Sequence, residues 1–190
     1  MPQTRGVRLP EAEIERLLAT WPVARLATVA PDGRPHLVPI VFARHAGALW
    51  SPIDAKPKGG EAGRAGAGRS AAGRGPEPAG GAEADVARRT PRLARVANVA
   101  AEPRVSVLLD HYDDDWRRLW WIRVDGRATL VGGDPGAEAA LRAKYPQYRE
   151  TPLYAGAPAL LRIEPERRTS WAASPLADAV RGGELPSRRP

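Results

Sequence analysis

Apolar side chains near the start of the chain recur at helical spacing. Ile14, Leu17 and Leu18 fall on one face of residues 10–20, and Pro10 with two early glutamates suits a first helical turn. Trp21-Pro22 is expected to end this helix, because proline disfavours helical geometry in the residue before it.

The pattern then changes to that of β-strands. Val23–Ala30 and Pro35–Ala43 are rich in branched apolar residues, and the Asp-Gly pair between them predicts a hairpin turn. Pro39 lacks a backbone donor, so it predicts an edge strand, a bulge or a place that a ligand approaches. After a second turn, Leu49–Ile53 is a third predicted strand.

The second half of the chain predicts two helices and four strands. Val105, Val107 and Leu109 alternate with their neighbours as in a half-buried strand, and Gly126 inside a long predicted strand suggests a bulge or a bend. Asp134 suits a helix cap. The predicted helices are Pro91–Ala101 and Pro135–Lys144, and the predicted strands are Arg104–Tyr112, Leu119–Val131, Ala159–Ile163 and Thr169–Ala173.

These elements predict a mainly β fold with flanking helices. Six or seven short strands, most of them joined by turns and therefore antiparallel, suggest a barrel. No G-x-G-x-x-G motif follows a strand, which argues against a Rossmann dinucleotide fold. We expect one domain over residues 1–175 and a flexible tail over residues 176–190.

Residues 59–90 break this pattern. They hold nine Gly and nine Ala, and Val86 is their only large apolar side chain. Such a segment cannot bury enough surface to offset its ordering entropy. We expect a disordered surface insertion; a flexible lid is the alternative.

Composition excludes several classes of site. The chain has no Cys, and its three His show no metal-site spacing, so no metal site is expected. It has no apolar run long enough to span a membrane and no secretory signal, which predicts a cytoplasmic protein. A net charge of +7 permits an anionic partner, but no dense Lys/Arg block with interleaved aromatics indicates specific nucleic-acid binding.

The most suggestive residues are four cations around the insertion. Lys56 and Lys58 follow the predicted strand that ends at Ile53, and Arg92 and Arg95 lie one turn apart at the start of the next helix. Helix N-termini attract anions, so the set suggests a phosphate site. Alternatively, the two arginines form the polar face of an amphipathic helix.

Other candidates are weaker. The acids at positions 113–115 suit a hard cation or a solvated turn. His36 could donate to a ligand, and His111 beside Asp110 could form an acid/base pair. Trp120 and Trp121 are adjacent on a strand, so one is expected in the core and the other outside, against a partner or a flat ring.

In order and spacing, the motifs resemble the flavin and deazaflavin split-barrel proteins related to pyridoxamine 5'-phosphate oxidase, in particular their actinobacterial coenzyme F420-dependent branch. The resemblance spans most of residues 7–173. It is carried by Trp21-Pro-Val-Ala-Arg-Leu-Ala-Thr-Val-Ala30, Gly33-Arg-Pro-His-Leu-Val-Pro-Ile-Val41, Leu49-Trp-Ser-Pro-Ile-Asp-Ala-Lys-Pro-Lys58, Arg95-Val-Ala-Asn-Val99, Pro103-Arg-Val-Ser-Val107 and Leu119-Trp-Trp-Ile-Arg-Val-Asp-Gly-Arg-Ala128.

The resemblance implies an FMN-binding split barrel that forms a homodimer, with cofactors in grooves between the subunits. It implies roles for matched residues: Val38 and Pro39 beside the ring system; Ser51, Pro52 and Ile53 along the ribityl chain; Lys56, Lys58 and Arg95 at the phosphate, with Arg92 as an addition; and Trp120 and Trp121 at the dimer groove. The insertion at 59–90 departs from the family pattern by separating the lysines from the helix.

The leading hypothesis is therefore an oxidoreductase that uses coenzyme F420 (8-hydroxy-5-deazaflavin), or FMN, to transfer a hydride to or from a small molecule. A second hypothesis is a non-catalytic binding or storage protein for the same cofactors. A third is a basic nucleic-acid-binding β-barrel.

Overall fold

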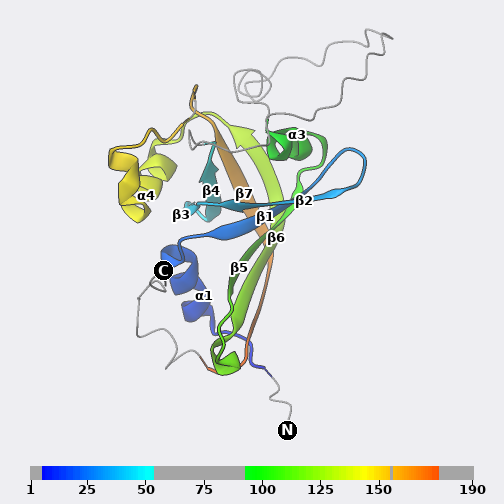
Figure 1. Ribbon diagram of the computed structural model, residues 1–190. Helices are drawn as coiled ribbons and strands as arrows, with labels where there is room; N and C mark the ends of the chain where they lie inside the picture. The colour runs from blue at the N-terminus through cyan, green and yellow to red at the C-terminus, as the bar shows by residue number, and fades with distance from the viewer. Residues whose placement is uncertain (1–5, 54–92, 155, 176–190) are drawn as a thin grey trace.

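Seven antiparallel strands form one sheet that curls into a split barrel (Figure 1). The computed structural model describes residues 6–53, 93–154 and 156–175, so the expected insertion at 59–90 and the tail at 176–190 lie outside these residues. The predicted mainly β fold is confirmed. In the order β2-β1-β5-β6-β7-β4-β3, the strands are β2 (Pro35–Ile40), β1 (Ala24–Val29), β5 (Arg104–His111), β6 (Trp120–Val131), β7 (Leu160–Ala172), β4 (Ala48–Pro52) and β3 (Ala43–His45).

In the described part of the chain three α-helices flank this sheet, and each corresponds to a predicted helix, although the second begins at Ala94, three residues later than predicted. The helix α1 (Glu11–Thr20) buries Ile14, Leu17 and Leu18. The cap predicted at Asp134 is confirmed, because its carboxylate accepts a hydrogen bond from the Ala137 N–H at 2.8 Å. The other helices are α3 (Ala94–Ala101) and α4 (Pro135–Lys144), with short 3₁₀ turns η1 (Trp116–Arg118) and η2 (Pro146–Arg149).

The second predicted strand is in fact two strands at opposite edges of the sheet. β2 stops at Ile40, and β3 begins at Ala43. Between them, the Tyr145 hydroxyl accepts from the Phe42 N–H at 3.0 Å and donates to the Phe42 carbonyl at 2.8 Å. At Phe42 the Tyr145 side chain thus replaces the backbone hydrogen bonds of a strand ladder. The sequence alone does not reveal this contact. β2 is an edge strand, as Pro39 predicted.

The two predicted closing strands are one continuous strand, β7. The segment 164–168 between the two predicted strands is mostly charged, and residues 164–167 are exposed, yet this segment still pairs with β6. The register shifts there, since Asp125 opposes Arg167 while Gly126 opposes Pro165. Glu166 is therefore the extra residue of a β-bulge, and the irregularity predicted at Gly126 is confirmed.

The apolar side chains form two clusters. One fills the barrel and receives α1 and α3. The other lies between α4 and the β3–β4 hairpin, with Trp50 and Leu141 among its buried members. Lys144 at the end of α4 donates to the Leu18 carbonyl at 3.0 Å and lies 3.6 Å from the centre of the Phe42 ring; burial lowers its pKa to about 7.

In the part of the chain described, no helix is long and apolar enough to cross a membrane.

Gly126→Ala should destabilise the fold. An added Cβ would collide with the backbone carbonyl of Glu164 at the bulge, and backbone cannot move aside as a flexible side chain can. We expect a loss of about 1–3 kcal/mol in the free energy of unfolding, measured by urea denaturation. Gly156→Ala, where nothing lies within 4 Å of the new atom, is the control and should be neutral. Equal stability of the two variants would contradict the close approach at the bulge.

Candidate functional site

One end of the barrel gathers buried polar groups around α3. Arg95 and Asn98 lie three residues apart on this helix and are only 7% and 4% exposed. The Asn98 amide donates to the Thr28 hydroxyl on β1 at 2.9 Å, and that hydroxyl lies 3.4 Å from the His36 Nδ1 on β2. Because a buried polar group costs free energy unless it is hydrogen-bonded, the Asn98–Thr28 contact fixes how α3 sits on the sheet. It thereby fixes the position of Arg95.

β4 brings a second set of predicted residues to this end. Figure 1 shows that β4 terminates at the same end of the barrel as α3. Ser51, Pro52 and Ile53 are all buried, and the Ile53 N–H is held by the Ala159 carbonyl at 3.0 Å. Along a strand side chains alternate, so Ser51 and Ile53 share the barrel side while Pro52 points to the other face.

The two residues predicted to lie beside the cofactor ring are both on β2, but their side chains lie on opposite faces of the strand. Val38 is half-buried and packs against the barrel cluster that contains Ile53. Pro39 is exposed on the outer face, where it lies opposite Arg25 of β1. Only Val38 therefore shares the barrel side with Ser51 and Ile53.

The predicted phosphate group is described in part. Arg95 lies at the second position of α3, in its first turn, where backbone N–H groups and the positive end of the helix dipole also lie. Lys56, Lys58 and Arg92 lie outside the residues that the structure describes. The described side chains are of the chemical types that a phosphorylated flavin needs. Val38 and Ile53 offer apolar surface, Ser51 offers a hydroxyl and Arg95 offers a guanidinium.

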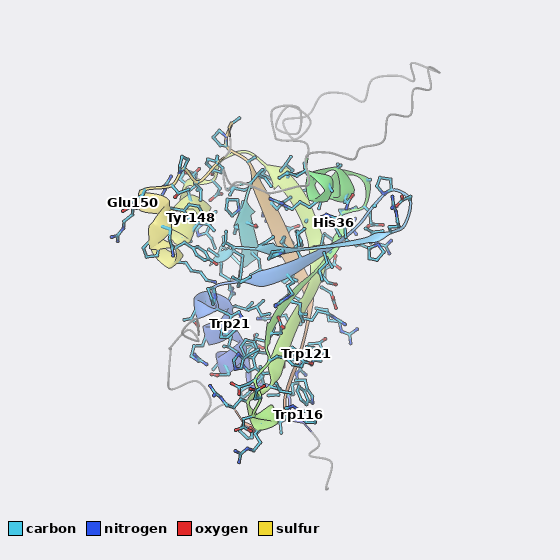
Figure 2. All side chains as sticks on the ribbon, in the orientation of Figure 1. Trp21, His36, Trp116, Trp121, Tyr148 and Glu150 are labelled. Carbon is cyan, nitrogen blue, oxygen red and sulfur yellow. The ribbon has the colours of Figure 1, made fainter. Side chains whose placement is uncertain are left out.

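One tryptophan of the pair is in the core and the other is outside, as predicted, but both lie far from α3. Trp120 is buried in the core and meets Trp21 edge-to-face, with ring centres 4.8 Å apart. Trp121 is on the outer face, opposite Trp171 of β7. Figure 2 shows His36 beside α3, whereas Trp121 lies along the strands toward Trp116 at the other end. Neither tryptophan reaches the Arg95 end of the barrel.

The other polar candidates form surface ion pairs. Asp110 pairs with Arg25 rather than with His111, so the predicted acid/base pair is wrong; adjacent residues of a strand point to opposite faces. His111 lies 3.4 Å from Asp113, which also meets Arg118 at 3.1 Å. A hydrogen bond from the Asp115 backbone, aided by Arg118 and His111, lowers the Asp113 pKa. Among the described residues, no group of acids and histidines is arranged to hold a metal ion.

Sequence reasoning missed Thr28 and Asn98. A signal was present, since Asn98 interrupts the apolar positions between Val96 and Val99 of the predicted helix. A polar side chain on the buried side of a helix implies a buried partner. Its partner is seventy positions away in the chain, which only the fold reveals.

Solved structures share this split-barrel fold at low sequence identity. A conserved hypothetical protein from Mycobacterium tuberculosis aligns with 21% identity and a TM-score of 0.57, over 91% of each chain. A heme binding protein from Mycobacterium smegmatis aligns with 17% identity and a TM-score of 0.55, over 88% of this chain and 56% of its own. A FAD-binding protein from Mesorhizobium loti aligns with 21% identity and a TM-score of 0.52, over 90% and 99%.

At these identities the likeness establishes the fold and not the ligand. No protein-family model matches the sequence, and a search of the curated proteins also finds no match.

Asn98→Leu should destabilise the protein by about 1–3 kcal/mol, because it leaves the buried Thr28 hydroxyl without its donor. Adding Thr28→Val should recover part of this loss, since two apolar partners leave less polar surface unsatisfied. Chemical denaturation of the two single variants and the double variant gives the coupling free energy. Strictly additive effects would show that the two side chains do not interact.

Proposed function

We propose that this protein is an oxidoreductase that binds coenzyme F420, or FMN, and transfers a hydride to or from a small molecule. The observation that carries the proposal is the buried guanidinium of Arg95 in the first turn of α3, at the end of the barrel where β4 terminates. The description of one fold neighbour as FAD-binding supports a flavin-type ligand.

The roles of the residues follow from their chemistry. Val38 and Ile53 would offer apolar surface to a flat ring, and the Ser51 hydroxyl would hydrogen-bond the polar chain attached to it. Arg95, with Lys56, Lys58 and Arg92, would hold the phosphate through charge-assisted hydrogen bonds. The ring supplies the hydride chemistry when bound, while the protein binds and orients it. Because F420 and FMN both carry a phosphate on such a chain, these residues suit either; the motif resemblance favours F420.

A non-catalytic binding or storage role is the second candidate. It is favoured by a fold neighbour, described as a heme storage protein from Vibrio cholerae, which aligns with 17% identity and a TM-score of 0.53. Nucleic-acid binding is less favoured, because many described arginines are neutralised within the chain. Arg25 pairs with Asp110, and Arg123 pairs with Asp125 at 3.0 Å.

Purified protein should bind F420 or FMN with submicromolar affinity, measured by fluorescence quenching against hemin and a random DNA duplex as competing ligands. Arg95→Gln should weaken that binding at least about tenfold, since hydrogen bonds to charged groups contribute about 1.5–3 kcal/mol. The paired change Lys56→Ala with Lys58→Ala should act in the same direction. The matched control is Arg149→Gln on η2, which changes the net charge equally at an exposed position.

Binding of hemin alone would sink the flavin proposal, and so would failure to bind either flavin. Tight flavin binding without reduction of the bound ring by any donor tested would favour the storage role.

We further propose that the outer face of β1 and β2 joins two copies of the chain. Leu37 is 62% exposed and Val29 38% exposed, although both lie in strands where apolar side chains are usually covered. Leu37 lies opposite Ala27, and the Trp121–Trp171 pair continues the same outer face on β6 and β7. A self-complementary sheet face of this kind suits a two-fold dimer. In such a dimer, Trp121 would be available to the groove between subunits.

Leu37→Lys should raise the dimer dissociation constant at least about tenfold, because it places a charge in an apolar interface. Light scattering coupled to size-exclusion chromatography measures the effect, and circular dichroism should show an unchanged fold. Ala139→Lys on the exposed side of α4 is the matched control. A monomeric parent protein, or a variant that dimerises as well as the parent, would refute this interface.

A further inference from the structure

A cavity of about 350 Å³ lies beside the part of β7 that β4 does not cover. β4 pairs with β7 only between Leu160 and Ile163, and just before β4 the chain turns at Gly47 out of β3. From Glu164 to Trp171, none of the described strands pairs with this edge of β7, and Val7 bridges to Ala172 at its end. The bulge at Glu166 lies at the same place, and α1 covers the opening from the other side.

The inner part of this cavity is apolar. Leu18 of α1, Leu49 of β4 and Val124 of β6 line it and are nearly inaccessible to solvent, at 2%, 1% and 0%. We call these three side chains the apolar floor. A volume of about 350 Å³ with such a floor is at the lower end of the range for small-molecule sites.

The mouth of the cavity is cationic on the barrel side. Arg44 of β3 and Arg168 of β7 both line it; we call them the arginine pair. Register places each on the barrel side of its strand, because Arg44 lies opposite Leu49 and Arg168 opposite Val124. Glu166 and Arg167 complete the rim with opposite charges.

The arginine pair shares one carboxylate on α1. Glu15 pairs with Arg44, and it accepts from Arg168 at 2.5 Å. Glu11 meets the other Nη of Arg168 at 2.8 Å. Of the described residues, the arginines line the cavity and these two carboxylates do not. A guanidinium has five N–H donors, and these contacts engage one nitrogen of Arg44 and two of Arg168.

We propose that this cavity binds a small molecule with an apolar body and a single carboxylate. The body lies on the apolar floor, and the carboxylate is held by the arginine pair in competition with Glu15. Among the described residues, none of those proposed for the cofactor site lines the cavity, so the proposal does not rest on flavin binding.

The test is an NMR titration of the ¹⁵N-labelled full chain with octanoate. A second titration uses octan-1-ol, which has an alkyl chain of the same length but no charge. Octanoate should bind more tightly than octan-1-ol, with the largest amide shifts at Leu18, Gly47 and Arg168. Arg168→Gln should weaken octanoate binding at least about tenfold through loss of charge-assisted hydrogen bonds. Glu15→Gln should strengthen it at least about threefold, because it removes the competing negative charge.

The opposite signs of these two effects separate a ligand site from a merely structural network. If the network only docks α1, both substitutions loosen the helix and change octanoate binding in the same direction. Glu13→Gln is the matched control, since Glu13 pairs with Arg16 on the same helix and does not line the cavity. Equal affinity for octan-1-ol would overturn the proposal, as would weaker binding to Glu15→Gln or shifts confined to another surface. The Glu15→Gln and octan-1-ol comparisons stand even if Arg168→Gln does not fold.

Discussion

The unequal pairing of β7 on its two sides shapes the rest of this molecule. One edge pairs with β6 over almost the whole strand, whereas the other meets β4 only between Leu160 and Ile163. Buried backbone groups need hydrogen-bond partners, so the remaining edge must be covered by something other than a strand. The N-terminal segment does this: Val7 forms a bridge to Ala172, and the Leu9 N–H donates to the Ser170 hydroxyl at 3.1 Å. The chain then enters α1, whose apolar face closes the barrel and whose carboxylates reach across the opening.

The two ends of the barrel consequently differ in chemistry. At one end, α3 brings a buried guanidinium to the place where β4 finishes, and a hydrogen bond between Asn98 and Thr28 holds that helix in position. Between α1 and β7, ion pairs centred on Glu15 span a cavity with an apolar floor. Each arrangement places arginine beside apolar surface, which suits anions that carry a hydrophobic part. They differ in that Arg95 is buried, while the arginines around Glu15 are about one-third exposed.

Most elements were predictable from local pattern, and the errors share a cause. The helix boundaries at α1 and α4 and the strand irregularity at Gly126 follow from prolines, caps and alternation, which act over a few residues, although the extra residue, Glu166, is on β7. The break between β2 and β3 depends on the Tyr145 hydroxyl, more than a hundred residues away. The continuity of β7 through its charged middle depends on pairing with β6, because an exposed strand face tolerates charge. Neither the Tyr145 contact nor the pairing of β7 with β6 can be predicted from a few neighbouring residues.

For the candidate site, too, some features follow from the local sequence and others only from the tertiary structure. The sequence by itself determined the residue types, the mainly β class and the presence of a helix that contains Arg95, because spacing and turn chemistry are local properties. Only the tertiary structure decided that Val38 shares a face with the β4 residues while Pro39 does not, since strand alternation depends on register. It also decided that Trp120 belongs to the core, far along β6 from Arg95. The cavity beside β7 had no counterpart in the sequence, because its walls come from α1, β3, β4, β6 and β7 and meet only when the sheet curls.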